Sequence, residues 1–596
     1  MIDEATPAFL GVARSVGGKF WRLRPQDERM GLAIAQRLQL PEVVGRLLAA
    51  RGQTLDSAEQ YLTPRLKDLL PDPGSFRDMD RAVARLVAAI ERRETIAVFG
   101  DYDVDGATSA ALLLRFLRGI GAADLRLYVP DRLIEGYGPN APALEKLRGE
   151  GAAVVITVDC GITAFAPLEA AAKAGLEVIV IDHHVAEPKL PIAAAIVNPN
   201  RLDETAGHGQ LAAVGVAFLL VVALNRALRG KGWYGASRPE PDLMQWLDIV
   251  ALGTVCDVVP LTGVNRALVT QGLKVMAQRR NVGLVALADA AGMNERPTAY
   301  HAGFLLGPRV NAGGRVGRSD LGARLLSTDD PLEAKDIAQQ LDALNAERRQ
   351  IEAAALEQAI TLAEGQAADN PHLIFVAQEG WHPGVIGIVA SRLKDRFERP
   401  ACVIALDGSA GKGSGRSIAG LHLGNAVIAA REAGIIAKGG GHAMAAGFEV
   451  DADRVEDLRV FLAARLKDHL GGVPLTPLLD VDGALQPRAA SADFATQIER
   501  LAPFGSGNAE PRFVLPNARI GFAEIVGGSH VRCFVEGGDG TRIKAIAFRA
   551  AETDLGRVLL ASRGAVLHLA GHLRRDTWQG RNETQLVIED AARPVN

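Results

Sequence analysis

The sequence predicts an α/β protein with a parallel-sheet domain, a second α/β domain joined to it by a long helix, and a C-terminal OB-fold β-barrel. Three observations predict this fold class. Short apolar runs alternate with helical patterns over residues 91–330, which is typical of a parallel sheet covered by helices, and a second α/β pattern covers 367–470. Residues 331–366 keep a helical apolar spacing, and after the initial Pro331 they contain no glycine or proline until Gly365. From residue 471, short strand-like runs are separated by turns rich in glycine and proline, as in small β-barrels.

The length of the chain requires several domains. With 596 residues, about three to five domains are expected. The changes of pattern predict their limits, and a mainly helical segment precedes the first sheet. The predicted divisions are 1–90, 91–330, 331–366, 367–470 and 471–596.

Composition excludes several classes of protein. Hydrophobic residues make up 48% of the chain, charged residues 23%, and the net charge is −4, which indicates a globular protein without an overall basic surface. The four cysteines are far apart in sequence and form no C-x-x-C pair, so we expect reduced thiols in a cytoplasmic protein rather than a zinc ribbon.

Membrane and export signals are weak. The N-terminal residues lack the basic-then-apolar pattern of a signal peptide. The most apolar stretch, residues 211–224, is shorter than the roughly 18–20 residues that cross a bilayer. We therefore expect a buried core helix there and no membrane partner.

The first α/β region contains four predicted strands. They cover residues 95–100, 124–130, 152–158 and 176–181, and a helical pattern covers 107–120. In open parallel sheets, ligands bind beyond the carboxyl ends of the strands.

Metal-binding side chains follow three of these strands. Like charges this close repel one another unless a cation lies among them. Oxygen-rich sites with one or two histidines suit Mn²⁺ or Mg²⁺, and this number of ligands fits two ions about 3.5–4 Å apart, which is the geometry of phosphoryl-transfer sites. Asp159 stands alone between the other clusters, so we expect it to bridge the ions. The candidate residues are Asp101, Asp103, Asp105, Asp159, Asp182, His183, His184 and, from a later segment, Asp257.

A calcium-binding EF-hand is the simplest alternative for residues 101–106. Its loop needs a glutamate at the twelfth position, where this chain has Leu112. The preceding segment also reads as a strand, whereas an EF-hand requires a helix. Both observations argue against calcium.

The glycine-rich stretches 307–315, 411–417 and 439–447 predict phosphate-binding loops. Glycine lets backbone N–H groups approach an anion closely. The adjacent residues His183 and His184 cannot point the same way in an extended segment, so one can bind metal while the other faces the substrate. The candidate phosphate-binding residues in the three loops are Arg309, Asn311, Arg315, Lys412, Ser414, Arg416 and His442.

Several of these segments resemble the motifs of the DHH phosphoesterase superfamily. VFGDYDVDG, VITVDCGI, IDHH and ALGTVCDVVP match its four motifs in order, and GWHPGVIGIVASRL, GSGRS and GGGHAMAAGF match its DHH-associated domain. GPRVNAGGRVG, the long helix and PFGSGNAEPRF with the predicted barrel narrow the resemblance to the single-strand-specific 5′→3′ exonucleases of that superfamily. The resemblance covers nearly all of the chain from about residue 40.

The resemblance implies roles for individual residues. Asp159, His184 and Asp105 would be catalytic, with His184 acting on the scissile phosphate and Asp159 bridging. Arg132 and Tyr137 would shape a narrow opening near the 5′ end, and either Arg309 or Arg315 would contact the 5′-phosphate beside Ser414 and Arg416. The implied metal ligands are Asp101, Asp103, Asp105, Asp159, His183 and Asp257.

The resemblance also implies a function. We expect a Mn²⁺- or Mg²⁺-dependent exonuclease acting on single-stranded DNA in repair and recombination, as a monomer, with a single-stranded-DNA-binding protein and a helicase as partners. Two alternatives stay open: a DHH phosphodiesterase of oligoribonucleotides or cyclic dinucleotides, and a catalytically silent replication scaffold. A manganese pyrophosphatase of the same superfamily is disfavoured, because it expects histidine where this chain has Asp101 and is much shorter.

Overall fold

The computed structural model describes residues 7–366, 372–470, 476–576 and 583–594. The chain divides into two compact units. The larger comprises Arg65–Gly472 with Gly505–Gly507, and the smaller comprises Met1–Pro64, Val473–Phe504 and Asn508–Asn596.

The larger unit begins with a five-stranded sheet in the order β3-β2-β4-β5-β6, and every neighbouring pair is parallel. The four strands predicted from the sequence are all present. The strands are β2 (Thr95–Gly100), β3 (Asp124–Tyr128), β4 (Ala152–Val158), β5 (Glu177–Ile181) and β6 (Ala195–Val197).

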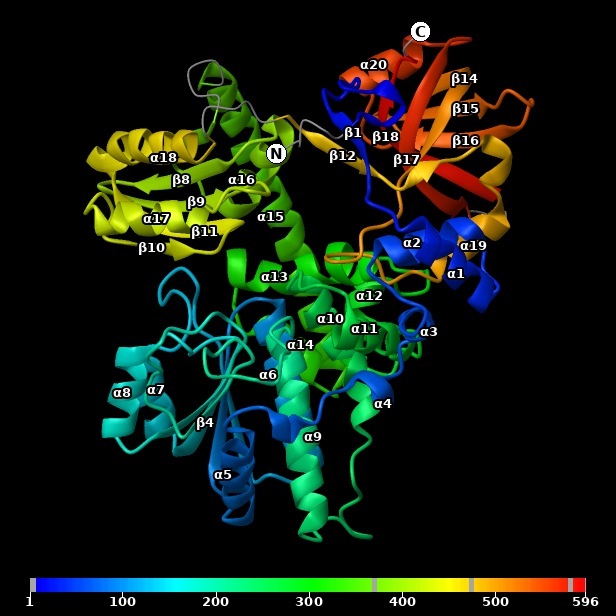
Figure 1. Cartoon of the computed structure of the whole chain (residues 1–596). Helices are drawn as coiled ribbons and strands as arrows, with labels where there is room; N and C mark the ends of the chain where they lie inside the picture. Colours follow the sequence, from blue (N-terminus) through cyan, green and yellow to red (C-terminus); the bar gives the residue numbers. More distant parts are fainter. Residues whose placement is uncertain (1–6, 367–371, 471–475, 577–582, 595–596) are drawn as a thin grey trace. The chain divides into compact units, whose positions relative to one another are not determined.

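Both faces of this sheet are buried, which explains its continuous apolar runs. Along β2, Ile96 and Val98 join one core cluster, whereas Ala97 and Phe99 join another, because successive side chains point to opposite faces. The first face packs against α5 (Met79–Glu91), α6 (Val104–Gly119) and α9 (Ala213–Gly230), and the second against α7 (Ala141–Gly149) and α8 (Phe165–Lys173). Figure 1 shows these helices around the sheet.

The apolar stretch at 211–224 lies in α9. This helix is long and apolar enough to cross a membrane by length and composition, but 67% of its most apolar window is buried inside the protein. Phe218, Leu220 and Leu224 belong to the core beneath the sheet. The expected core helix is therefore present.

A group of helices continues the larger unit after the sheet. The long helix α15 (Pro331–Gln366) then leads to the second sheet, as the sequence predicts. The helices between α9 and α15 are η3 (Leu243–Trp246), α10 (Leu247–Cys256), α11 (Gly263–Met276), α12 (Val282–Ala290), the π-helix η4 (His301–Leu306), α13 (Gly307–Val316) and α14 (Leu321–Ser327), and α4 (Leu66–Leu69) and η2 (Pro73–Ser75) precede the sheet.

The second sheet has the order β10-β11-β9-β8-β7. Only the β7–β8 pair is parallel. Its strands are β7 (Ile374–Glu379), β8 (Ala401–Asp407), β9 (Ala410–Arg416), β10 (Lys438–Gly441) and β11 (Ala445–Asp451), and its helices are α16 (Ile386–Phe397), α17 (Leu423–Glu432), η5 (Ala452–Arg454) and α18 (Val455–Leu470).

The smaller unit contains the predicted barrel. Strand β14 pairs with both β15 and β17, and this pairing closes the sheet in the order β14-β15-β16-β18-β17, the Greek-key arrangement of an OB-fold. The barrel elements are β14 (Phe513–Val526), β15 (His530–Glu536), β16 (Arg542–Ala547), α20 (Asp554–Ala561), β17 (Val566–Asp576) and β18 (Glu583–Ala592), preceded by β12 (Leu478–Val481), β13 (Gly483–Ala484), η6 (Pro487–Ala489) and α19 (Ala492–Glu499).

The N-terminal segment joins this barrel unit up to residue 64, and the predicted segment 1–90 is thus shared between the units. Strand β1 (Phe20–Leu23) pairs in parallel with β12, and the buried Trp21 donates its indole N–H to Asp590 at 2.9 Å. The remaining elements are η1 (Phe9–Gly11), α1 (Glu28–Leu38), α2 (Glu42–Ala50) and α3 (Ala58–Leu62). The five-part division of the sequence stays a prediction.

Candidate metal and phosphate site

Three central strands of the first sheet end at the same level. Gly100 of β2 lies opposite Val158 of β4, which lies opposite Ile181 of β5. The next residues are therefore neighbours: the N–H of Asp101 donates to the Val158 carbonyl at 3.3 Å, and that of Asp159 to the Ile181 carbonyl at 3.0 Å. This alignment gathers the predicted side chains at one edge of the sheet.

Three overlapping groups of side chains could each hold a metal ion. Their candidate ligand atoms lie within 4.8 Å of one another inside each group. Asp159 belongs to two of the groups and His183 to two, so the groups form one continuous cluster. The groups are Asp101–Asp103–Asp159, Asp105–His183–Asp257 and Asp159–His183–His184.

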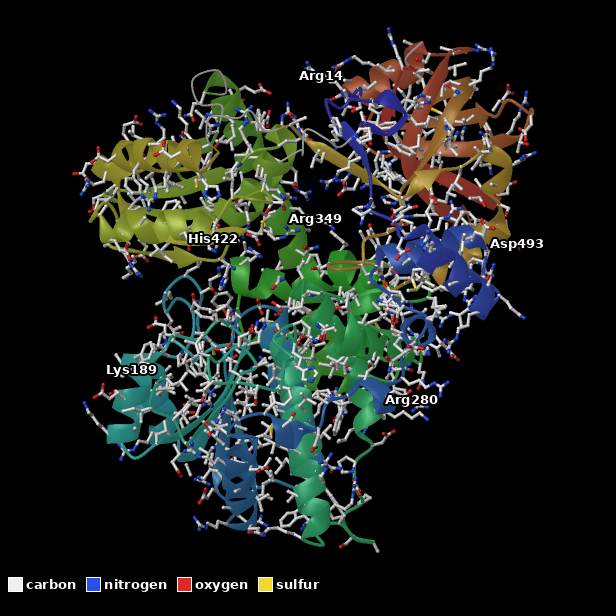
Figure 2. The ribbon with its side chains drawn as sticks, in the orientation of Figure 1. Arg14, Lys189, Arg280, Arg349, His422 and Asp493 are labelled. Carbon is white, nitrogen blue, oxygen red and sulfur yellow. The ribbon has the colours of Figure 1, made fainter. Side chains whose placement is uncertain are left out.

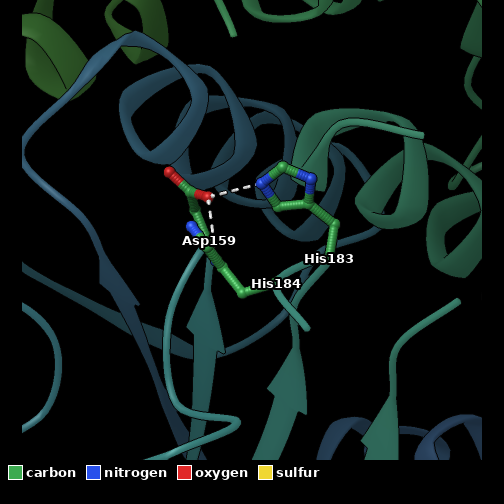
Figure 3. A group of neighbouring side chains, drawn as sticks. All are labelled: Asp159, His183 and His184. Atoms are coloured by element: carbon green, nitrogen blue, oxygen red, sulfur yellow. Dashed lines mark ion pairs between the residues drawn. The ribbon is translucent and has the colours of Figure 1, made fainter. Parts of the chain in front are cut away.

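His183 lies at the centre of this cluster. Its Nε2 atom is 3.3 Å from Asp159 Oδ1 and 3.9 Å from Asp105 Oδ2, while its Nδ1 atom is 3.7 Å from Asp257 Oδ2. Figure 3 shows the imidazole of His183 turned toward the Asp159 carboxylate. Burial lowers the pKa of His183 to about 4, with the neighbouring His184 adding to the effect. A neutral imidazole is the form that binds a metal.

Ionisation of Asp105 and Asp257 is disfavoured by burial and by the neighbouring carboxylates. Burial, then the charge of Asp103, raises the pKa of Asp105 to about 7. Burial and the charges of Asp105 and Asp103 raise that of Asp257 to about 9. Among the described residues, Asp101 Oδ1, Asp257 Oδ2 and His183 Nε2 are buried without a hydrogen-bond partner. These atoms fit two divalent cations, which would satisfy them and restore the ionised state.

Local backbone geometry fixes two of the carboxylates. Both oxygens of Asp105 accept backbone N–H groups, from Ala213 at 2.6 Å and Val214 at 2.8 Å, at the start of α9. Asp103 caps α6 by accepting the N–H groups of Asp105 and Gly106. At Gly106 a Cβ atom would lie 2.4 Å from the carbonyl oxygen of Asp101, so only glycine permits this close turn.

His184 is held by Asp182, a residue grouped above with the candidate ligands. Asp182 Oδ1 accepts from His184 Nδ1 at 2.7 Å, and its oxygens also accept the N–H groups of Ile162, His183 and His184. With these bonds Asp182 belongs to none of the three metal groups. The sequence identified Asp182 as a charged residue after a strand, but it did not predict that Asp182 orients His184.

Tyr137 and His442 lie beside His184. The Tyr137 hydroxyl donates to the Asp159 carbonyl at 2.8 Å and is 3.2 Å from His184 Nδ1. The ring of His442, which follows β10, is stacked 6.4 Å from that of His184. The second sheet therefore contributes to the same site.

A cluster of arginines borders the carboxylates. Arg132 lies over the ring of Tyr102 at 4.9 Å. Arg315 donates to the Gly384 carbonyl at 2.9 Å, and its burial, followed by the charges of Arg132, Arg348 and Arg416, lowers its pKa to about 10. Mutual repulsion of this kind marks a place prepared for an anion. Sequence reasoning did not single out Arg348, which lies within the long helix, where it pairs with Glu352 at 2.7 Å.

Arg309 does not join this cluster. It is buried, its Nε atom lies 2.8 Å from Asp342 Oδ1 on α15, and its Nη1 atom donates to the Leu305 carbonyl at 2.7 Å. The prediction left Arg309 and Arg315 as alternatives for the 5′-phosphate, and of the two it is Arg315 that lies near the other arginines.

Two of the predicted glycine-rich loops are regular elements. Residues 307–316 form helix α13, where Gly314 lies so close to the Tyr102 carbonyl that a Cβ would be 2.7 Å from it. Residues 410–416 form strand β9, where a Cβ at Gly413 would clash with Phe448. In both elements glycine permits close packing. Because side chains alternate along a strand, Lys412, Ser414 and Arg416 lie on the face of β9 opposite to Gly413.

The barrel has an aromatic pair on its outer surface. Phe522 of β14 lies opposite Phe534 of β15, and neither side chain is buried. Several neighbouring basic residues form ion pairs across the strands: Arg532–Glu524, Arg542–Glu536 and Lys544–Glu583. This face offers stacking surface with little net charge.

The chain matches three protein-family models. The DHH family, N-terminal domain, matches residues 95–254, the DHHA1 domain matches 370–468, and the RecJ OB domain matches 481–590. These ranges coincide with the first sheet, the second sheet and the barrel.

Curated relatives and solved structures agree with these three domain matches. The single-stranded-DNA-specific exonuclease RecJ of Escherichia coli is 36% identical over 580 residues, covering 96% of this chain and 98% of the relative. That of Dickeya dadantii is 37% identical over 562 residues, covering 92% and 96%. The crystal structure of RecJ in complex with Mn²⁺ from Thermus thermophilus superposes with a TM-score of 0.80 at 29% identity, covering 97% of this chain and 80% of that one. The chain therefore belongs to the RecJ family.

Proposed function

We propose that this protein is a metal-dependent 5′→3′ exonuclease that degrades single-stranded DNA to 5′-mononucleotides. The observation that carries the proposal is the continuous carboxylate–histidine cluster in which Asp159 and His183 are each shared by two groups. Its relatives are single-stranded-DNA-specific exonucleases, and we infer that this chain acts in DNA repair and recombination.

Two Mn²⁺ or Mg²⁺ ions are the proposed cofactors. Asp101, Asp103, Asp105, Asp159, His183 and Asp257 would hold them, with Asp159 shared. Related structures contain Mn²⁺ and Mg²⁺. When bound, such a pair lowers the pKa of a water molecule and stabilises the attacking and leaving oxygens of a phosphodiester.

The surrounding residues would orient the strand. His184, held by Asp182, would donate a hydrogen bond to the scissile phosphate. Arg315, Arg416 and Ser414 would bind the 5′-phosphate, and Arg132 with Tyr137 would border the opening. His442 would line the site from the second sheet. The barrel, with Phe522 and Phe534, would bind single strands by stacking.

The small-substrate alternative is less well supported. A phosphodiesterase of dinucleotides would need the two sheets but not the barrel, which matches the RecJ OB domain. The scaffold alternative conflicts with the complete set of candidate ligands.

The remaining proposals concern the cellular setting. We infer that the protein acts in the cytoplasm as a monomer, with a single-stranded-DNA-binding protein and a helicase supplying its substrate. Four free cysteines support a reducing compartment.

The test uses purified full-length protein with Mn²⁺ and three substrates: a 5′-phosphorylated single strand, the same strand in blunt duplex, and a dinucleotide. We expect stepwise loss of mononucleotides from the 5′ end of the single strand, with the duplex intact. Cleavage of the dinucleotide alone would support the small-substrate alternative, and metal binding without cleavage would support the scaffold.

A further inference from the structure

The motif GWHPGVIG at 380–387 connects β7 to α16 and contains a tight turn. The carbonyl of His382 accepts the N–H of Val385 at 3.0 Å, which closes a β-turn with Pro383 and Gly384 at its centre. Helix α16 begins directly after this turn. Within the described parts of the chain, none of these four residues belongs to a group that could hold a metal ion.

The chain on both sides of the turn is anchored by packing. Trp381 is buried, and its indole N–H donates to Gln358 Oε1 on α15 at 2.8 Å. Trp381, Val385 and Ile386 belong to one core cluster with residues of β7 and β8. The position of the turn relative to α15 and the second sheet is therefore fixed.

The side chain of the half-buried His382 closes the same turn. Its Nδ1 atom accepts the backbone N–H of Gly384 at 3.0 Å. A backbone N–H can only donate, so Nδ1 is unprotonated and the ring hydrogen is on Nε2. Asparagine and aspartate make the same bond to the residue two positions on in an Asx-turn. Burial lowers the pKa of His382, so Nδ1 remains an acceptor at neutral pH.

Gly384 connects this imidazole to Arg315. Its carbonyl accepts the N–H of Arg315 Nη1 at 2.9 Å. A Cβ atom at Gly384 would lie 2.4 Å from the carbonyl oxygen of Arg315 and 3.0 Å from His382 Nδ1, so only glycine fits between them. Two consecutive hydrogen bonds therefore link His382 to the guanidinium of Arg315.

The Arg315 guanidinium needs such a fixed acceptor. The charges of Arg132, Arg348 and Arg416 all disfavour its cationic form, and like charges of this kind push one another apart. The start of α16 lies against the same cluster, because a Cβ atom at Gly387 would be 3.0 Å from both Arg416 Nη2 and Ser414 Oγ. The turn and the first turn of α16 thus contact each residue proposed to bind the 5′-phosphate.

We propose that His382 is a positioning residue for recognition of the 5′ end. Acting through Gly384, it holds the Arg315 guanidinium in the orientation that binds the 5′-phosphate. This inference rests on the proposed role of Arg315. A purely structural role of His382 in the turn would affect stability and leave the preference for a 5′-phosphorylated strand unchanged, so the preference is the quantity to measure.

The experiment uses the full-length protein with Mn²⁺ and two strands of one sequence, with a 5′-phosphate or a 5′-hydroxyl. The ratio of their kcat/KM values measures the preference. His382→Ala should lower this ratio about 5- to 10-fold, the usual effect of one lost hydrogen bond. His382→Asn should keep the wild-type ratio, because its amide oxygen can replace Nδ1. His382→Gln should resemble His382→Ala, because its acceptor is one bond further from the backbone.

His422 provides a matched control. Its Nδ1 atom also accepts a backbone N–H, that of Asn425 at 3.1 Å, where it caps α17. It is exposed and is labelled in Figure 2. His422→Ala removes the same kind of bond from the same α/β region, and it should leave the ratio unchanged. Thermal unfolding of each variant shows whether it is folded.

Three results would overturn the proposal. If Arg315→Ala lowers the ratio and His382→Ala does not, the role of Arg315 stands and that of His382 is wrong. If His382→Asn is as impaired as His382→Ala, the Nδ1 acceptor is not the cause. If Arg315→Ala itself leaves the ratio unchanged, the proposed role of Arg315 is wrong and the inference fails with it.

Discussion

The Nδ1 atom of His184 lies 2.7 Å from Oδ1 of Asp182, a fully buried carboxylate whose oxygens also accept three backbone N–H groups. Burial opposes protonation of His184, but the hydrogen bond to Asp182 and the negative charges of Asp182, Asp103 and Asp105 together outweigh it and raise the pKa of the imidazole. The pair therefore favours an imidazole that presents Nε2–H on the side away from Asp182.

Asp182→Asn should lower the single-turnover rate of strand cleavage by about 10- to 100-fold, the usual cost of losing a partner that orients an active-site histidine. Mn²⁺ affinity should change much less, because Asp182 is outside the candidate ligand groups. Rapid-quench kinetics and metal titration measure the two effects. An equal loss of metal affinity and rate would instead make Asp182 a ligand.

Asp159→Asn should remove stabilisation by Mn²⁺ while leaving the metal-free protein at least as stable as the wild type. Asp159 has a left-handed backbone with φ of 61°, which asparagine tolerates better than alanine. Its burial and the charges of Asp103 and Asp105 raise its pKa, so losing the charge relieves repulsion. Thermal unfolding with EDTA and with Mn²⁺ checks both statements. A variant still stabilised by Mn²⁺ to the wild-type extent would contradict the shared-ligand role.

Arg309→Ala should lower the stability of the protein, whereas Arg315→Ala should change its preference for the 5′ end of the strand. The first breaks the partly buried pair with Asp342 and should cost about 1–3 kcal/mol of unfolding free energy. The second should leave stability nearly unchanged and weaken the preference for a 5′-phosphorylated strand over a 5′-hydroxyl strand. Urea unfolding and paired substrates distinguish them. If Arg309→Ala removed the 5′-phosphate preference without loss of stability, the assignment would reverse.

Removal of both 1–64 and 473–596 should leave a folded fragment. That fragment should cleave dinucleotides at a rate close to the full chain and bind long single strands much more weakly. Removal of 473–596 alone should give an aggregating protein, because β1 would lose its partner β12 and Trp21 its partner Asp590. Size-exclusion chromatography and cleavage assays compare the two truncations. Equal losses on long and short substrates would count against the barrel as a binding platform.

The ion pair between the buried His572 and Glu589 should stabilise β17 and β18 within a limited range of pH. Both its nitrogens face acceptors, Pro511 O at 2.8 Å and Glu589 Oε1 at 2.9 Å, so the ring is held as a cation. Burial opposes ionisation of both partners, but their contact raises the pKa of His572 and lowers that of Glu589 to about 2.

The raised pKa of His572 gives stability that is complete below about pH 6.5 and lost as the pH rises through the folded-state value. The depressed pKa of Glu589 gives stability that is present above about pH 4.5 and lost as the pH falls toward 2. His572→Leu should therefore reduce hydrogen-exchange protection of β17 and β18 most between about pH 4.5 and 6.5. The same substitution in a Glu589→Gln background should show no such window, and a window that persisted there would exclude this pair as its cause.

The sequence by itself determined the strands and most of the candidate metal residues. Apolar runs such as 152–158 must be buried on both faces, which requires a parallel sheet, and parallel strands bring their carboxyl ends to one edge. Asp101, Asp159 and His183 could therefore be grouped before their distances were known. The long helix at 331–366 followed equally directly from local pattern.

Only the tertiary structure decided which candidates act together. Arg309 and Arg315 are six positions apart on α13, and nothing local distinguishes them until α15 places Asp342 beside one and Arg348 near the other. Asp182 and Asp159 both follow strands, but backbone N–H groups satisfy only Asp182. The pairing of β1 with β12 joins residues more than 450 positions apart. Each of these depends on contacts between distant segments, and local pattern does not specify the partner in such a contact.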